Sequence, residues 1–173
     1  MIRSFNGKTP QIADSAFISE AAYIVGDVEI GENTSVWPGA VIRGDCGKIA
    51  IGRGSVIEDN CVIHSGSPAS TGDVTIGNNV IMGHGAVSNC RKIGNNVLVG
   101  MNATLLHDAE IGNFCIIAAG CLVKEKMVIP DGCLVAGVPG KIKGEVASKQ
   151  KRWVTGSPLG YSILTQKYKL EGL

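Results

Sequence analysis

Aliphatic side chains return at every sixth residue along most of this chain. The series starts at Ile12, is interrupted by an insertion around 46–48 and a polar loop at 65–73, drops one residue after Ser88, and ends at Val135. Six is a multiple of the two-residue period of a strand and does not fit the 3.6-residue period of a helix. The pattern therefore predicts many short strands joined by turns. The positions in the series are Ile12, Ile18, Ile24, Ile30, Val36, Ile42, Ile51, Ile57, Ile63, Ile76, Met82, Ser88, Ile93, Val99, Leu105, Ile111, Ile117, Val123, Ile129 and Val135.

Turn residues follow these aliphatic positions. Glycine comes directly after the aliphatic at positions such as Gly31, Gly52, Gly77 and Gly94, and Asn or Asp often follows it, as in IGEN and IGNN. These residue types tolerate the positive φ angles that tight turns need. A strand and a turn in every six residues produce a coil of parallel strands, so the predicted fold class is an all-β solenoid, a parallel β-helix of hexapeptide repeats.

The residue two places before each aliphatic should also face the inside of the coil, where only small side chains fit. Cysteine behaves as a small apolar residue when buried, and the chain has no CxxC pair, so we expect most of its 6 cysteines to be packing residues; the positions of Cys46 and Cys90 stay open. The predicted inward slots are Thr34, Ala40, Ser55, Cys61, Ala86, Ala103, Cys115, Cys121 and Cys133.

The repeat ends near residue 140, and the composition then changes. Residues 145–152 are polar and favour a helix, 156–158 contain helix breakers, and Tyr161, Leu164 and Tyr168 recur at helical spacing. We therefore divide the chain into a coil over 1–140 and a helical segment over 141–173 that packs back along the coil.

Composition narrows the function classes. The formal net charge is +1, which gives no electrostatic reason to expect nucleic acid or a charged membrane as partner. There is no apolar run long enough for a membrane span, and residues 1–10 lack the apolar segment of a signal peptide. We expect a cytoplasmic protein.

Counting the repeat in threes places the candidate chemistry on two sides of the coil. His64 and Asn89 each follow a third-side position by one residue, so they should stack on neighbouring rungs, about 4.8 Å apart, with Arg43 one rung earlier. His84 falls on the second side, where Asp59 is its stacked neighbour.

Two adjacent sides of one coil point away from each other, so His64 and His84 should not meet within one chain. A cyclic trimer would place the His84 side of one subunit against the His64 column of the next. Imidazoles that converge from two chains suggest a transition metal, above all zinc, whose catalytic sites keep three protein ligands and one open position.

Two long segments carry a family resemblance. Residues 41–64 read VIRGDCGKIAIGRGSVIEDNCVIH, and residues 75–106 read TIGNNVIMGHGAVSNCRKIGNNVLVGMNATLL. They resemble γ-class carbonic anhydrases and their relatives, which include proteins labelled ferripyochelin-binding or acyltransferase-like. The resemblance implies a left-handed β-helix with three hexapeptides per turn, and a homotrimer with its metal at the subunit interfaces.

The resemblance also implies a ligand set. His64 and His84 match the first two of three metal-binding histidines, and Asn89 stands where the third belongs. Because an amide oxygen is a weaker zinc ligand than imidazole, affinity for zinc, or for iron or cobalt in its place, should fall. His107 is out of phase with the column and does not replace the missing histidine.

Five further residues match positions with roles in catalysis. Arg43 and Asp45 match an RGD motif, and Asp59 matches the acidic residue that pairs with that arginine across the interface. Glu58 stands where the family has Gln, which orients the metal-bound water. Tyr161 matches a tyrosine near the metal.

Three functions follow as hypotheses. The first is reversible CO2 hydration by hydroxide generated at the metal. The second is acyl-CoA-dependent acyl transfer with His84 or His107 as base, because the same fold hosts such enzymes. The third is a non-catalytic trimer whose metal site is eroded at Asn89.

Overall fold

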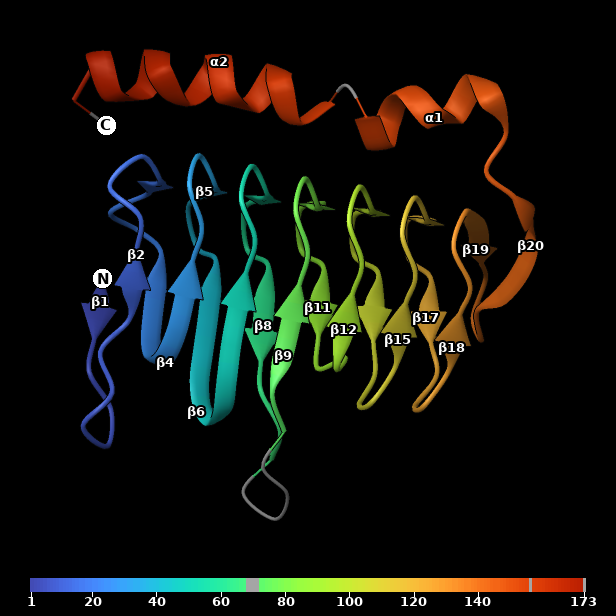
Figure 1. Ribbon diagram of the computed structural model, residues 1–173, viewed down its shortest axis with the longest axis horizontal. Helices are drawn as coiled ribbons and strands as arrows, with labels where there is room; N and C mark the ends of the chain where they lie inside the picture. Colours follow the sequence, from blue (N-terminus) through green and yellow to red (C-terminus); the bar gives the residue numbers. More distant parts are fainter. Residues whose placement is uncertain (68–71, 156, 173) are drawn as a thin grey trace.

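The computed structural model describes residues 1–67, 72–155 and 157–172. In these residues the chain winds into a coil of short parallel strands, and two helices lie along one side of it (Figure 1). The predicted parallel β-helix with a helical C-terminal segment is confirmed, and the coil has about seven turns. Residues 68–71 of the predicted loop lie outside the described residues.

The strands stack in ladders along three sides of the coil. The first side contains β2 (Gln11–Ile12), β9 (Val74–Ile76), β12 (Lys92–Ile93), β15 (Glu110–Ile111) and β18 (Val128–Ile129). The second contains β3 (Phe17–Ile18), β5 (Ser35–Val36), β7 (Val56–Ile57), β10 (Ile81–Met82), β13 (Leu98–Val99), β16 (Ile116–Ile117) and β19 (Cys133–Ala136). The third contains β1 (Ile2–Arg3), β8 (Val62–His64), β11 (Val87–Ser88), β14 (Thr104–Leu105) and β17 (Leu122–Val123).

Two longer strands join the third side to the first. They are β4 (Tyr23–Ile30) and β6 (Val41–Ile51), which pair with each other in parallel along most of their length. The first part of β6 pairs with β8 on the third side, and its last part pairs with β9 on the first. The predicted insertion at 46–48 is therefore the bend of β6 between two sides of the coil.

The six-residue series forms the core. Ile42, Ile57, Ile63 and Met82 are fully buried, and Ser88, which interrupts the series, is buried as well. The predicted small slots also face inward: Cys61, Cys115 and Cys121 are buried and unpaired with any other cysteine. Cys90, left open by the sequence, is fully buried. Each rung buries its own aliphatic residues, so stability accumulates along the coil.

The corners of the coil follow a rule that the sequence pattern only partly revealed. The third residue after an inward aliphatic repeatedly has a left-handed backbone conformation, as at Asn33 (φ 55°), Asn60 (58°) and Asn96 (55°). Asparagine tolerates this region better than most residues. Position 77 requires glycine for a different reason: a Cβ there would lie 2.6 Å from the carbonyl oxygen of Gly94, on the next rung.

The C-terminal segment covers the second side. After β20 (Lys141–Glu145), which pairs antiparallel with β19, the chain forms α1 (Ser148–Thr155) and α2 (Ser157–Leu170). Both helices run back along the coil (Figure 1). Tyr161 and Tyr168 of α2 pack against Phe17 and Trp37 of the second side. No helix of the described residues is long and apolar enough to span a membrane.

Candidate metal centre

His64 lies at the end of β8, next to the first part of β6. The strand register pairs Arg43 with His64, as the repeat predicted. Nε2 of His64 is 2.9 Å from Oδ1 of Asp45, and the guanidinium of Arg43 donates to the other carboxylate oxygen of Asp45. The imidazole is mostly shielded, with 13% of its side chain exposed. Asp45 therefore links the guanidinium to the imidazole.

Asn89 stacks on His64 from the next rung, also as predicted. Its Nδ2 lies 3.3 Å from Nδ1 of His64 and 3.4 Å from the carbonyl oxygen of His64. With the Asn89 amide donating to Nδ1, the proton of a neutral imidazole is on Nε2 and points at Asp45. Both nitrogens of His64 thus have a partner in its own chain.

Opposing influences act on the Asp45 carboxyl. Its burial favours the neutral form, but hydrogen bonds from Arg43 and His64, together with the charge of Arg43, outweigh this and hold the pKa of Asp45 below its ordinary value. Asp45 is consequently ionised at neutral pH. We call Arg43, Asp45, His64 and Asn89 the His64 cluster.

His84 lies at the corner that follows β10, on a different side of the coil. Its Nδ1 is 2.9 Å from Oδ2 of Asp59, and its Nε2 is 3.3 Å from Oε2 of Glu58. The backbone N–H of His84 also donates to Oε2 of Glu58, at 2.8 Å. Two carboxylates thus hold opposite edges of one imidazole ring, which is about half exposed.

Glu58 is the most buried acid of this group, with 4% of the residue exposed. The hydroxyl of Tyr161, carried by α2, donates to Oε1 of Glu58, and the Tyr161 ring meets Trp37 edge to face. Burial raises the pKa of Glu58, and the nearby His84 opposes this only in part. We call Glu58, Asp59, His84 and Tyr161 the His84 cluster.

The predicted site residues thus fall into two sets of four. None of the hydrogen bonds or ion pairs found among the described residues joins the two clusters. Asp59, which the resemblance pairs with an arginine across an interface, contacts His84 in its own chain, whereas Arg43 contacts Asp45. The catalytic and metal-binding roles assigned to these residues stay predictions.

One residue beside the His64 cluster was not predicted. Cys46 follows Asp45 at the bend of β6, and its thiol lies with the Asp45 carboxylate and the His64 imidazole, all potential ligand atoms within 4.8 Å of one another. Imidazole, carboxylate and thiolate are the donors that zinc accepts, so the residues around His64 fit this metal. The signal in the sequence was the RGDC run at the start of an insertion.

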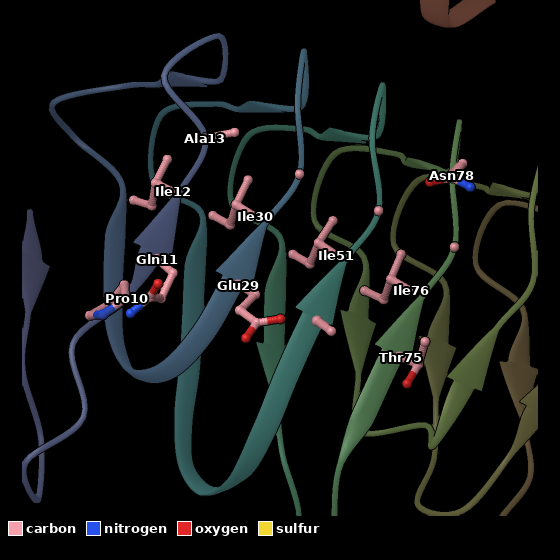
Figure 2. Close-up of a pocket in the computed structure, with 14 residues that line it drawn as sticks. Pro10, Gln11, Ile12, Ala13, Glu29, Ile30, Ile51, Thr75, Ile76 and Asn78 are labelled. Carbon is pink, nitrogen blue, oxygen red and sulfur yellow. The ribbon is translucent and has the colours of Figure 1, made fainter.

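A large hollow lies elsewhere, on the first side of the coil (Figure 2). It is an open groove of about 850 Å³ along β2, β4, β6 and β9. Its apolar lining residues, such as Ile30, Ile51 and Ile76, are themselves buried, and its acid Glu29 is paired with Lys48. It brings together no group of candidate catalytic residues.

Comparison with known proteins places this chain in one class, the hexapeptide-repeat proteins. Residues 9–44 and 92–125 match the family model described as bacterial transferase hexapeptide (six repeats). A crystal structure of a hexapeptide transferase family protein from Anaplasma phagocytophilum is 34% identical, with a TM-score of 0.90 over 96% of this chain and 97% of that one.

Curated relatives define the class more narrowly. A carbonic anhydrase of Geobacillus kaustophilus is 41% identical over 169 residues, which cover 98% of this chain and 91% of that protein. The mitochondrial gamma carbonic anhydrase 2 of Arabidopsis thaliana is 34% identical over 95% of this chain, which spans 60% of that relative's length. The chain belongs to the γ-carbonic anhydrase-like family of hexapeptide-repeat proteins.

Proposed function

We propose that this protein is a homotrimeric metalloprotein that binds zinc at its subunit interfaces and hydrates CO2 reversibly. The observation that carries the proposal is the arrangement of the two clusters on different sides of one coil. Each presents a histidine together with ionisable partners, and a cyclic trimer can bring the His64 cluster of one subunit to the His84 cluster of its neighbour.

His64 and His84 of neighbouring subunits would hold the metal, with Asn89 at the position of the third histidine. Zinc, when bound, lowers the pKa of water and so supplies a nucleophile for CO2 near neutral pH. In each subunit His84 would have to exchange one of its present carboxylate partners for the metal. Asp59 is the partner that His84 can more readily give up, because 39% of its side chain is exposed and water can solvate the released carboxylate.

The remaining residues have roles that follow from their contacts. Glu58 is shielded and has a raised pKa, which suits a group that accepts and returns a proton during the reaction. The Tyr161 hydroxyl fixes the direction of the Glu58 carboxylate. Asp45 orients the ring of His64 and balances the charge of Arg43.

The first test measures metal and assembly together. Protein purified without chelators should contain about one zinc, iron or cobalt per subunit by mass spectrometry of the metals, and should sediment as a trimer. CO2 hydration should be lost after chelation and return with zinc. A metal-free protein that zinc does not reconstitute, or a stable monomer, would contradict the proposal.

Asn89→His tests whether asparagine at the position of the third histidine weakens the metal site. If the third histidine position limits metal affinity, the variant should bind zinc more tightly and hydrate CO2 faster than the wild type. Activity gained in the variant alone would favour the non-catalytic, eroded site over the enzyme. Activity already present in the wild type would exclude erosion.

Acyl transfer from acyl-CoA is the second candidate. One support is a hollow of about 210 Å³ beside the His64 cluster, and this hollow is lined in part by Asn89, Arg91 and His107. The other is that the similar Anaplasma protein is named a hexapeptide transferase family protein. Acetyl-CoA at saturating concentration should then raise the melting temperature, and His107→Ala should remove the effect. An unchanged melting temperature would argue against acyl transfer.

A further inference from the structure

We infer that Cys46 is a metal ligand, and that it holds a divalent transition metal together with Asp45 and His64 of the same chain. The inference rests on the proposed metal centre at His64 and changes its ligand set. It assigns a thiolate where the family resemblance offers only the weak amide ligand Asn89. The metal would then have three protein ligands before any neighbouring subunit contributes.

The geometry of β6 and β8 supports this set. Arg43 and His64 are register partners, and β6 bends immediately afterwards, which brings residues 45 and 46 beside the end of β8. The thiol, one carboxylate oxygen and one imidazole nitrogen all lie within 4.8 Å of one another. Ligands about 2.0–2.3 Å from a tetrahedral zinc are separated by roughly 3.3–3.8 Å, so small side-chain shifts would complete the site.

The hydrogen bond between His64 and Asp45 marks the position for the ion. Nε2 of His64 lies 2.9 Å from Oδ1 of Asp45, and its N–H donates to that oxygen. A metal ion between them replaces that proton with a bond to each atom. The other oxygen of Asp45 keeps its bond from Arg43, so the guanidinium need not leave.

Asn89 has a different role in this arrangement. It contacts the Nδ1 edge of His64, at 3.3 Å, whereas Asp45 lies at the Nε2 edge. When Nε2 binds a metal the ring proton moves to Nδ1, and a rotated Asn89 amide can accept it with its oxygen. Asn89 would thus be a positioning residue that fixes the ring, as partners of metal-bound histidines commonly do.

The ligand types select the metal. A carboxylate and a thiolate carry two negative charges, which neutralise a divalent ion, and imidazole completes a set that suits zinc or cobalt over magnesium or calcium. The His84 cluster offers no equivalent within its own chain, because Glu58 and Asp59 lie at opposite edges of the ring. The other five cysteines are in or against the buried core.

Cobalt substitution of the assembled protein tests the inference, because thiolate bound to Co²⁺ gives an intense charge-transfer band in the near ultraviolet that nitrogen and oxygen ligands do not give. Wild-type protein should show this band on titration with Co²⁺. Cys46→Ser should lose it and bind the metal roughly 10- to 100-fold more weakly, at least as large a loss as removal of a supporting partner causes. Cys133→Ser, at the far end of the coil, is the matched control and should keep the band.

The outcomes separate this inference from the proposed function. Cobalt that binds in a His64-dependent way without the band would overturn the role of Cys46 and leave the metal centre standing. Cobalt that does not bind at all would overturn both. A band that survives in Cys46→Ser would assign the thiolate to another cysteine. A wild-type spectrum without the band would overturn the role of Cys46 even if a variant fails to fold.

Discussion

The His64 cluster is built from neighbouring rungs of the coil, whereas the His84 cluster is completed by a helix from the end of the chain. Arg43, His64 and Asn89 occupy equivalent positions on successive rungs, and their contacts follow from strand register. In the His84 cluster, Tyr161 reaches Glu58 across 103 positions of sequence. The first cluster therefore depends on the coil alone, and the second depends on the docking of α2.

The comparison extends to the charged groups. Asp45 has a guanidinium and an imidazole beside it, and its pKa is lowered. Burial raises the pKa of Glu58, and the charge and backbone N–H of the neighbouring His84 oppose this rise only in part. One cluster thus keeps a fixed negative charge while the other holds a carboxyl that can exchange a proton. This difference suits one cluster to binding a cation and the other to proton transfer.

Removal of the aromatic surface beneath α2 should produce the largest loss of stability. Trp37 is 5% exposed and contacts Phe17, Tyr161 and Tyr168. Trp37→Ala should lower the free energy of unfolding by about 3–5 kcal/mol and increase hydrogen exchange in α2. Exchange around His64 should change little. Leu170→Ala, on the same helix but 87% exposed, is the control. An equal loss of stability in both variants would contradict the conclusion that packing on Trp37 holds α2 against the coil.

Asp45→Asn should have the next largest effect, on the His64 cluster. The variant loses charge-assisted hydrogen bonds to Arg43 and His64, so the free energy of unfolding should fall by about 1–2 kcal/mol at neutral pH. Because the folded-state pKa of Asp45 is lowered, this contribution exists above the ordinary aspartate pKa and is lost as pH falls through the lowered value. Denaturant unfolding at several pH values measures it. A difference that does not shrink in acid would contradict the ion-pair explanation.

Tyr161→Phe should have a smaller effect on the His84 cluster. It keeps the ring that packs on Trp37 and removes the hydroxyl that donates to Glu58. We expect a loss of about 1 kcal/mol and a further rise in the pKa of Glu58, because the ionised carboxylate loses a donor. Tyr168→Phe, which also packs on Trp37, is the matched control. Chemical-shift titration of Glu58 should show no change in the control.

Glu58→Gln should have the smallest effect, and it should be a gain. A folded-state pKa above the ordinary value means that Glu58 favours folding at low pH and that this contribution is lost as pH rises through the raised pKa. The neutral amide avoids that loss. The variant should therefore gain stability relative to wild type between acidic and neutral pH, as melting temperatures in a pH series would show. A difference in melting temperature between variant and wild type that is the same at every pH would mean that Glu58 has no raised pKa.

Much of the candidate site could be predicted from the repeat. The stacking of Arg43, His64 and Asn89, and of Asp59 and His84, follows from counting residues in sixes, because strand pairing repeats the same geometry on every rung. What counting could not supply was the direction of side chains at corners and bends. There the backbone leaves the regular strand, as at Cys46, and neighbours in space no longer follow from the period.

The sequence by itself determined the solenoid, the inward positions and the side of the coil on which each histidine lies. It could do so because each rung buries its own six-residue pattern and pairs only with adjacent rungs, so local information suffices. Only the tertiary structure decided that Asp45 and Asn89 hold the two edges of His64, that Cys46 comes beside them, and that Tyr161 reaches Glu58. These contacts depend on the bend of β6 and on the docking of α2, which no period in the sequence encodes.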